Sequence, residues 1–560
     1  MRLKSIVLCS ASAGALILGA VPAAAQTTPP PPVEDTGPAA PTDPAVEAQS
    51  TPAPDQGSPQ TDDAVQTATG QDQTADEGEA IVVTGLRRSL QSAQNIKRNS
   101  DQIVDVIVAE DIGKLPDRTV SEALARVPGI TVERAAGEAG DIFLRGLRDP
   151  ATTYNGREIF TAEARNVAPQ DFPAGSVAAL EVFKSQTAEQ IEGNLAGLIN
   201  VRSRRPFDFK DREISGSLNA TYADLANDVA WNGNLLVSDR FDTGIGEIGL
   251  LVNASYTELN YNDNSRFNSG DFFGINPDPL DPTVFRDNLG NNIAGQTVRV
   301  PVVVGLFQNA GKRWRPAGNF AVQWRAADNL QVYVDGLYQG FRREVSDRSL
   351  FVPLFGAAAY TNVTIDDEGD SFGYPGSLTA TSCCVPDGFQ SATREETNTY
   401  QVAGGAIWEN DRFRIGLDLA RTKSKFDLSI YSFDYRLTAA PRVDVDFDTS
   451  GDGGAEFDFT GVDTTDRSNY LYRGFFDRQL IAKGDDYQAR LDATLKDVTP
   501  WLRAVDVGLR FNDRDAGFSN AQRYSTLNGN TPLIMVPFSL DLDPYELTFR
   551  DGNQNGVDTL

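Results

Sequence analysis

The residues that most often carry out catalytic or metal chemistry are scarce in this chain. Its 560 residues contain no histidine and three cysteines. Histidine is the commonest general base near neutral pH and a usual zinc ligand, so its absence excludes His-ligated zinc and Ser–His–Asp catalysis. We find no other plausible pairing of a nucleophile with a base. The sequence therefore predicts neither an enzyme nor a cofactor.

Two weaker signals for metal or redox chemistry remain. The adjacent Cys383 and Cys384 lie among Gly, Pro, Ser and Thr. A disulfide between neighbouring residues would be strained. We favour a structural role in holding a loop over a redox or metal role, and leave open whether the two cysteines are bonded. Residues 551–558 (DGNQNGVD) and 446–451 (DFDTSG) resemble the first half of a calcium loop, but Phe457 occupies the terminal-ligand position of the second. We interpret both as acidic surface loops and predict no metal site.

The charge balance restricts the partners of the chain. Fifty Lys and Arg against 78 Asp and Glu give a net charge of −28, which argues against nucleic-acid binding because phosphates require clustered cations. Mean hydropathy is −0.33, and no apolar run after residue 25 approaches the ~18 residues of a membrane helix. Spanning by β-strands stays open, since each strand gives a weak signal.

The N-terminal 85 residues divide into three parts. Arg2, Lys4, an apolar stretch and Ala23-Ala24-Ala25 predict a bacterial signal peptide over residues 1–25. Residues 26–78 contain no aromatic residue, Lys or Arg and are rich in Pro, Thr, Gln, Ala and Asp, so we expect an acidic disordered segment.

A short β-prone strip follows at residues 79–85 (EAIVVTG). Because it adjoins a flexible tail, it is suited to pairing with the sheet edge of another protein. It is equally consistent with the first strand of the next domain.

Residues 86–210 indicate a mixed α/β domain. Val120, Ala123, Leu124 and Val127 form a one-sided apolar stripe after Thr119, which predicts a helix. Further predictions are strands at 103–108, 130–133, 142–144 and 181–184, a tight turn at 155–156 and a short helix at 177–180.

From residue 211 onward the hydrophobic period is two. The alternating rows are 214–222, 231–237, 248–256, 318–324, 330–338, 400–408, 413–419, 487–495 and 505–511. Large aromatics end many rows, as in the aromatic girdles of membrane barrels. Short connections at 326–329 and 410–411 alternate with long Asp-, Gly- and Asn-rich stretches at 258–316, 341–397 and 426–484.

This asymmetry of loops favours an antiparallel transmembrane β-barrel over 211–560 rather than a soluble β-sandwich. Nine strands across 214–514 give about 33 residues per strand, whereas plugged transporters have ~22 strands. We therefore expect about the first half of a 22-stranded barrel, from a truncated frame or a fragment.

Several motifs in 86–210 resemble the plug of TonB-dependent outer-membrane receptors. They are residues 111–117 (DIGKLPD), 121–129 (SEALARVPG), 144–146 (LRG) and 181–208 (EVFKSQTAEQIEGNLAGLINVRSRRPFD), in the order of the family. Asn194 stands where a second glycine is common. The form of these motifs is similar to that in the large proteobacterial branch of the family, which is often associated with carbohydrate uptake.

The resemblance implies a mechanism and a location in the Gram-negative outer membrane. Residues 79–85 would be the TonB box, and residues 86–210 the plug inside the barrel. The periplasmic C-terminal domain of TonB would pair with Glu79, Ala80, Ile81, Val82, Val83 and Thr84 and pull, using the inner-membrane proton-motive force. The partners would be TonB, outer-membrane lipid and a small extracellular ligand.

The charged residues of the expected plug suggest polar contacts with the barrel wall. Those singled out are Arg145, Glu181, Glu192, Arg202, Arg204 and Arg205, with Arg490, Asp492, Asp506 or Arg510 as wall partners. Ordinary solvated charges are the alternative.

The ligand itself is not readable from the sequence. A saccharide is expected from the resemblance, and a ferric siderophore is the alternative; a passive or adhesive barrel is a different class of function, which needs neither plug nor TonB box. Loop aromatics either stack on sugars or pack the loops together: Phe267, Phe272, Phe273, Tyr374, Tyr431, Tyr435, Tyr470 and Tyr472.

Overall fold

A computed structural model describes most of the chain from residue 93 to residue 526. The described residues are 93–98, 100, 102–108, 119–148, 150–164, 167–172, 177–191, 195–269, 271–287, 297–366, 374–381, 385–447, 454–499, 501–526, 531–532, 547 and 557. The expected signal peptide, acidic segment and TonB box lie outside them, as do residues 111–117, Glu192, Cys383, Cys384 and, apart from Val557, the 551–558 loop. All of the described residues belong to one compact unit.

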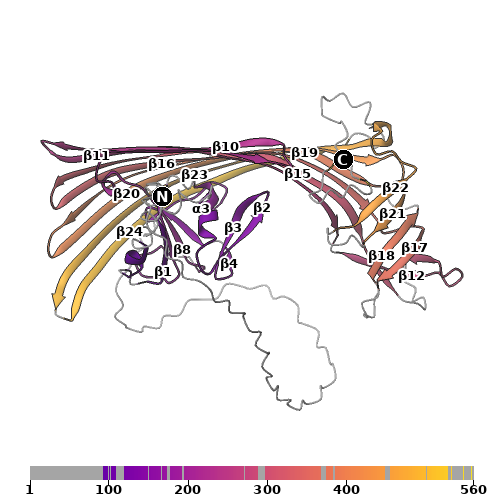
Figure 1. Ribbon diagram of the computed structural model, residues 1–560, viewed down its shortest axis with the longest axis horizontal. Helices are drawn as coiled ribbons and strands as arrows, with labels where there is room; N and C mark the ends of the chain where they lie inside the picture. The colour runs from indigo at the N-terminus through magenta and orange to yellow at the C-terminus, as the bar shows by residue number, and fades with distance from the viewer. Residues whose placement is uncertain are drawn as a thin grey trace, which may run out of the picture. The chain divides into compact units, whose positions relative to one another are not determined.

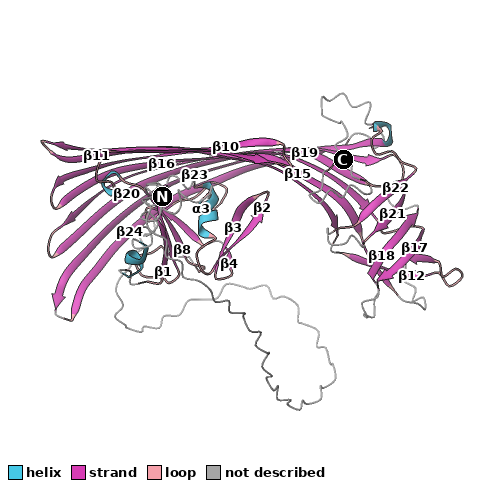
Figure 2. Cartoon of the chain, in the orientation of Figure 1, coloured by secondary structure: helices cyan, strands magenta, loops and turns pink. Residues whose placement is uncertain are grey.

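The N-terminal module contains two small sheets. Its five-stranded sheet has the order β1-β7-β8-β5-β6, and a second sheet has the order β2-β3-β4 (Figures 1 and 2). The elements are β1 (Val104–Val108), α3 (Val120–Leu124), β2 (Ile130–Ala135), β3 (Glu138–Leu144), β4 (Leu147–Arg148), β5 (Ala151–Tyr154), β6 (Arg157–Glu158), η1 (Pro169–Asp171), β7 (Val177–Phe183), β8 (Leu198–Ser203) and η3 (Pro206–Asp208).

The predicted helical stripe of the module is confirmed. Val120, Ala123 and Leu124 of α3 are fully buried, in one apolar cluster with Leu180 and Ile199 of the sheet. Thr119 occupies the N-cap position, but its side chain makes no capping hydrogen bond. No described helix is long and apolar enough to cross a membrane.

The predicted helix at 177–180 is wrong. Val177–Phe183 is strand β7, which pairs with β1 on one side and β8 on the other. Ladder hydrogen bonds to two neighbours outweigh the weak helical preference of a four-residue segment.

Nine long antiparallel strands form the second body, here called the wall (Figure 1). Within the described residues their order follows the chain, with the short β25 (Thr531–Pro532) beside β23. They are β9 (Glu213–Ala223), β10 (Asp228–Thr243), β11 (Gly246–Asn268), β15 (Val303–Ala327), β16 (Leu330–Pro353), β19 (Asp387–Glu409), β20 (Phe413–Leu437), β23 (Tyr470–Thr499) and β24 (Leu502–Ser525). Each predicted alternating row lies in one of them, so the partial antiparallel wall is confirmed.

The two faces of the wall differ in chemistry. Val252, Val402 and Val507 are more than half exposed, although they lie in strand interiors. On the opposite face, Asn253 and Gln401 are buried. An apolar face left open to the surroundings is what contact with lipid requires.

The stretches expected as long loops are more ordered than predicted. They contain the distal halves of the long strands and a seven-stranded sheet of order β14-β12-β13-β17-β18-β21-β22. Its strands are β12 (Phe272–Pro277), β13 (Val284–Asp287), β14 (Val298–Pro301), β17 (Ala359–Asp366), β18 (Tyr374–Thr381), β21 (Arg442–Asp446) and β22 (Glu456–Thr460). An apolar cluster joins this sheet to the distal strands through Leu306, Leu350 and Tyr435.

Candidate functional site at the contact between module and wall

The N-terminal module reaches the wall through the tip of a hairpin. Asn155 and Gly156 adopt positive φ values of 53° and 78°, which confirms the predicted tight turn between β5 and β6. Asn200 of β8 fixes this turn, because its Oδ1 accepts hydrogen bonds from Thr153 Oγ1 at 2.9 Å and from the Gly156 amide at 2.8 Å. The next residue, Arg157, is thereby held at the wall.

Arg157 lies between two wall carboxylates. Its Nη1 is 2.6 Å from Asp335 Oδ1 on β16, and its Nε donates to Asp418 Oδ1 on β20 at 2.8 Å. Burial alone would lower the pKa of the guanidinium, but the hydrogen bonds and charges of Asp418 and Asp335 outweigh it and raise that pKa above its ordinary value. Arg157 therefore remains charged inside the contact.

A second arginine completes this cluster. Arg205 Nη2 lies 3.2 Å from Asp335 Oδ2, and its guanidinium sits 4.7 Å from the ring centroid of Tyr333. The Tyr333 hydroxyl donates to Asp418 Oδ2 at 2.6 Å. Two cations thus face two carboxylates, so the cluster is formally neutral, which is the condition under which buried charges are tolerated.

Glu158, next to Arg157, is held by three further strands. Its amide donates to Gln488 Oε1 at 3.0 Å, and its carbonyl accepts from Gln488 Nε2 at 2.8 Å and from Gln401 Nε2 at 3.0 Å. Its carboxylate accepts from Arg514 Nη2 at 2.8 Å. Wall side chains therefore satisfy the backbone groups of β6, an edge strand of its own sheet.

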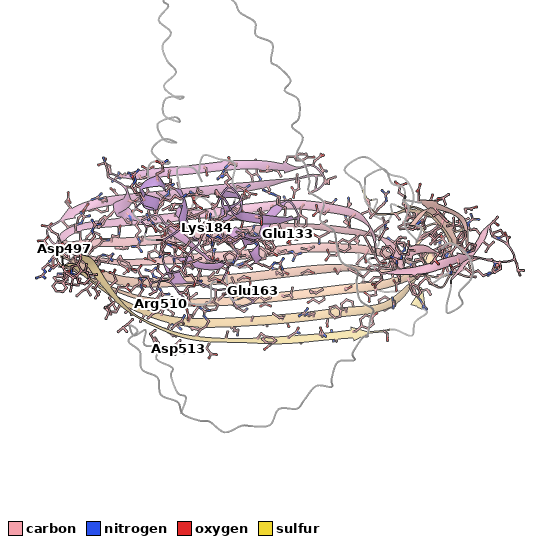
Figure 3. The ribbon with its side chains drawn as sticks, turned by 90° about the horizontal axis from the view of Figure 1, so that it is seen from below. Glu133, Glu163, Lys184, Asp497, Arg510 and Asp513 are labelled. Atoms are coloured by element: carbon pink, nitrogen blue, oxygen red, sulfur yellow. The ribbon has the colours of Figure 1, made fainter. Side chains whose placement is uncertain are left out.

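A separate ion cluster fixes the β3 side of the module. Arg315 of β15 lies 2.8 Å from Glu138 Oε1 through Nη1 and donates from Nε to Asp171 Oδ1 at 3.0 Å. Burial raises the pKa of Asp171 despite the opposing charge of Arg315. Figure 3 shows the module lying over the wall strands, with Glu163 and Arg510 labelled; Glu163 Oε1 accepts from Thr397 Oγ1 at 2.9 Å, and Arg510 Nη2 donates to the Gly156 carbonyl.

The residues singled out from the sequence divide between the wall and the module itself. Arg205 reaches the wall, at Asp335. Glu181 and Arg202 instead pair with each other at 3.4 Å, because β7 and β8 are neighbours, and Arg145 donates to the Lys184 carbonyl at 2.9 Å. Arg204 follows β8 and is half-buried.

The expected wall partners also differ. Arg490 pairs with Asp492 at 2.6 Å within β23, and Asp506 accepts from Thr494 Oγ1 at 2.6 Å, whereas Arg510 does contact the module. Sequence reasoning missed Arg157, Glu158, Glu138 and Asp171. For Arg157 and Glu158, the available signal was their position directly after a predicted tight turn.

Most of the loop aromatics are used in packing. Phe433 stacks on Tyr472 at 4.8 Å, and Tyr435 meets Tyr470 edge-on at 5.5 Å. Tyr431 is 54% exposed, although its ring also stacks on that of Phe475 at 6.4 Å. The alternative of loop packing therefore accounts for Tyr435, Tyr470 and Tyr472.

The family model described as TonB-dependent Receptor Plug Domain matches residues 96–198, the stretch that contains the hairpin tip with Arg157 and, from the second ion cluster, Glu138 and Asp171. These residues are the plug domain of a TonB-dependent receptor. The chain thus combines a plug domain of the TonB-dependent receptor type with a strand-built wall whose apolar face is exposed, which are the two parts of a Gram-negative outer-membrane receptor. The plug lies against the polar face of the wall, at residues such as Gln401 and Ser424, and so covers part of it.

Solved structures with a similar arrangement include the ferric citrate transporter FecA in the unliganded form, at 13% identity and a TM-score of 0.27, covering 76% of this chain and 80% of that one. The siderophore receptor PiuA from Acinetobacter baumannii has 10% identity and a TM-score of 0.25, covering 74% and 79%. The copper transporter OprC has 14% identity and a TM-score of 0.30, covering 77% and 63%. TM-scores this low support no conclusion about the ligand of this chain. No curated protein matches the sequence.

Proposed function

We propose that the receptor imports its ligand when TonB pulls on residues 79–84 and loosens the plug from the wall. The observation that carries this proposal is the type of contact around Arg157, which consists of ion pairs and hydrogen bonds to Asp335 and Asp418. Ion pairs and hydrogen bonds can be exchanged for water one at a time as the plug moves, whereas an apolar core resists such exchange. In the part of the chain that the structure describes, the buried apolar cluster of the plug includes one residue of the wall, Leu337.

In this mechanism the force enters at the N-terminal end of the plug. The strip at Glu79–Thr84 pairs as an added strand with the C-terminal domain of TonB, and the backbone hydrogen bonds of that strand transmit the pull. The chain then leads through residues 93–98 to β1, the edge strand of the plug sheet. Lys184, which follows β7, contacts Asp105 of β1, so a pull on β1 acts on the centre of the sheet.

The ligand is proposed to be a small saccharide, on the resemblance of the plug motifs alone. Of the loop aromatics, Phe272 is 50% exposed and remains available to stack on a sugar ring. A ferric siderophore is the alternative ligand. Titration of the purified protein with an oligosaccharide panel and a ferric-siderophore panel separates them: saccharide-only binding supports the proposal, and siderophore-only binding replaces it.

Deleting residues 79–84 tests the energised mechanism. We expect the deletion to abolish both capture of the C-terminal domain of TonB and uptake of the ligand, while surface binding of the ligand is kept. Replacing residues 70–75 of the acidic segment by Ser and Gly is the matched control and should leave both unchanged. Uptake that continues at the normal rate without residues 79–84 would indicate a passive barrel instead.

A further inference from the structure

The outer side of the wall has a hollow that the uptake mechanism does not use. A cavity of about 740 Å³ extends across β11, β15, β16, β19 and β20. Its floor is one row of paired residues, in which Ala310, Ser346 and Ala392 are neighbours on successive strands. Tyr431 continues the row at one end, and the β9–β10 turn at 225–228 closes the other. Three small side chains in a row make the hollow.

The hollow lies on the face opposite the plug. Side chains alternate between faces along a strand. On β15, Arg315 contacts the plug. Lys312 is three residues away, an odd number, so it lies on the opposite face of the strand and points away from the plug. On β16, Asp335 contacts the plug and Glu344 points away; on β19, Gln401 contacts the plug and Arg394 points away. All three outward residues line the hollow.

Cations are arranged on both sides of the floor. Lys312, Glu344 and Arg394 form the row on one side, and Arg348 lies on the other, where its Nη1 donates to Gln308 Oε1 at 2.7 Å. Lys312 already has a carboxylate partner, because its Nζ lies 2.7 Å from Oε1 of the buried Glu258. Arg394 is 68% exposed at its side chain, and its Nε is 3.9 Å from Glu344 Oε1. An exposed pair at that distance is weak, so the guanidinium can exchange Glu344 for a stronger anion.

The height of the hollow on the wall places it at the level of lipid headgroups. Trp314 is two residues from Lys312 on the same outward face, about 7 Å along the strand. Tyr338 and Tyr400, stacked at 5.0 Å, also point outward, and Tyr338 lies on β16 four residues nearer the short connections than Arg342, the partner of Trp314. The hollow lies beyond these aromatics on the side away from the short connections at 328–329 and 410–412, which is the outer-leaflet side of such a wall.

We propose that this hollow binds the phosphorylated sugar headgroup of an outer-leaflet glycolipid, with Lys312 and Arg394 contacting a phosphate and Tyr431 lying against the sugar. A soluble ligand would have to compete with lipid for an opening at this height. The volume falls in the range of small-molecule sites. Guanidinium and ammonium groups are the usual partners of phosphate oxygens. This site requires the outer-membrane location, but not the uptake mechanism.

The test compares two pairs of substitutions in the full chain. The first is K312Q with R394Q, inside the hollow. The matched control is K423Q with K425Q, two half-exposed cations that point outward from β20 but do not line the hollow. Each protein is reconstituted in phosphatidylcholine nanodiscs containing lipid A with both phosphates, or the same lipid A after dephosphorylation, and the lipid retained by the protein is measured by native mass spectrometry.

We expect the unmodified protein and the control pair to retain phosphorylated lipid A, and the K312Q/R394Q protein to bind it about tenfold more weakly, with dephosphorylated lipid bound weakly by all. Unchanged retention by K312Q/R394Q would overturn the proposal, because the lipid would then bind outside the hollow. An equal loss in the control pair would also overturn it, because binding would then depend on outward cations in general. Displacement of the lipid by inorganic phosphate alone would also overturn it in favour of a simple anion site. Unchanged trypsin resistance of the wall shows that each variant is folded.

Discussion

Arg157 Nη1 lies 2.6 Å from Asp335 Oδ1, although the two residues are 178 positions apart in the chain. One belongs to a two-residue strand of the plug, β6, and the other to the wall strand β16, five residues after its first residue, Leu330. Their side chains are about 5% exposed or less. This ion pair, shared with Asp418, belongs to one of two buried ion clusters that join the plug to the wall.

Replacing Asp335 by Asn should weaken this junction strongly. The substitution leaves Arg157 and Arg205 with one carboxylate between them, and removal of one partner from a buried pair costs about 3–5 kcal/mol. We expect the plug to become sensitive to protease at lower urea concentration while the wall resists as before.

Asp492→Asn is the matched control for this change. Asp492 pairs with Arg490 on the wall, and both side chains are about one-third exposed. Loss of such a pair costs about 0–1 kcal/mol. Equal effects of the two substitutions on plug protection would mean that the Arg157 cluster is not a special junction.

A glycine of the wall makes room for the plug. A Cβ on Gly484 would lie 2.3 Å from Phe160 Cε2, whereas a Cβ on Gly517 would meet nothing within 4 Å. Phe160 is buried and carries the Arg514 guanidinium 4.4 Å from its ring centroid, so the ring has little space to move. Gly484→Ala should therefore cost about 1–3 kcal/mol of plug docking, and Gly517→Ala almost nothing.

Limited proteolysis in detergent measures this difference directly. Early cleavage of the plug is expected for Gly484→Ala alone. If both glycine variants kept the plug equally protected, Phe160 would not pack on β23 as described.

The docking of the plug should depend on pH through Asp171. Burial raises the pKa of Asp171 above its ordinary value of 3.8, so the folded plug holds this proton more tightly than the unfolded chain does. Stability from this group is therefore fully present below pH 3.8 and falls as the pH rises from 3.8 through the raised pKa. Asp171→Asn keeps an oxygen to accept from Arg315 and should flatten this part of the pH profile of plug unfolding.

Asp105→Asn serves as the comparison for the pH profile. Burial raises the pKa of Asp105, but hydrogen bonds from Lys184 and Lys97 outweigh it and the pKa lies below 3.8. Its contribution is present above pH 3.8 and is lost only below it. Asp105→Asn should thus lower the stability of the plug by the same amount at every pH above 4, without altering how stability changes with pH. If Asp105→Asn flattened the pH profile and Asp171→Asn did not, the pH dependence would not come from Asp171.

The sequence predicted the wall better than the site. Alternation such as that at 248–256 marks a strand wherever one face meets lipid, and every such row lies in a wall strand. Beyond the membrane level both faces of β11 and β15 carry polar residues, so the period of two disappears and the distal halves were taken for loops. Arg157 could not be paired with Asp335 because local pattern carries no information on contacts between residues so far apart. Arg202 and Glu181 satisfy each other across neighbouring strands, a pairing that depends on strand order.

Cross-linking between residues 162 and 424 tests the central claim most directly. The Ala162 amide donates to Ser424 Oγ at 2.9 Å, and Ser429, on the same strand, has the opposite parity and lines the outer hollow. In a Cys383→Ser, Cys384→Ser background, a short thiol cross-linker should join plug and wall in A162C/S424C outer membranes and fail in A162C/S429C. Cross-linking of the second pair, or of neither, would contradict a plug held against the polar face of the wall.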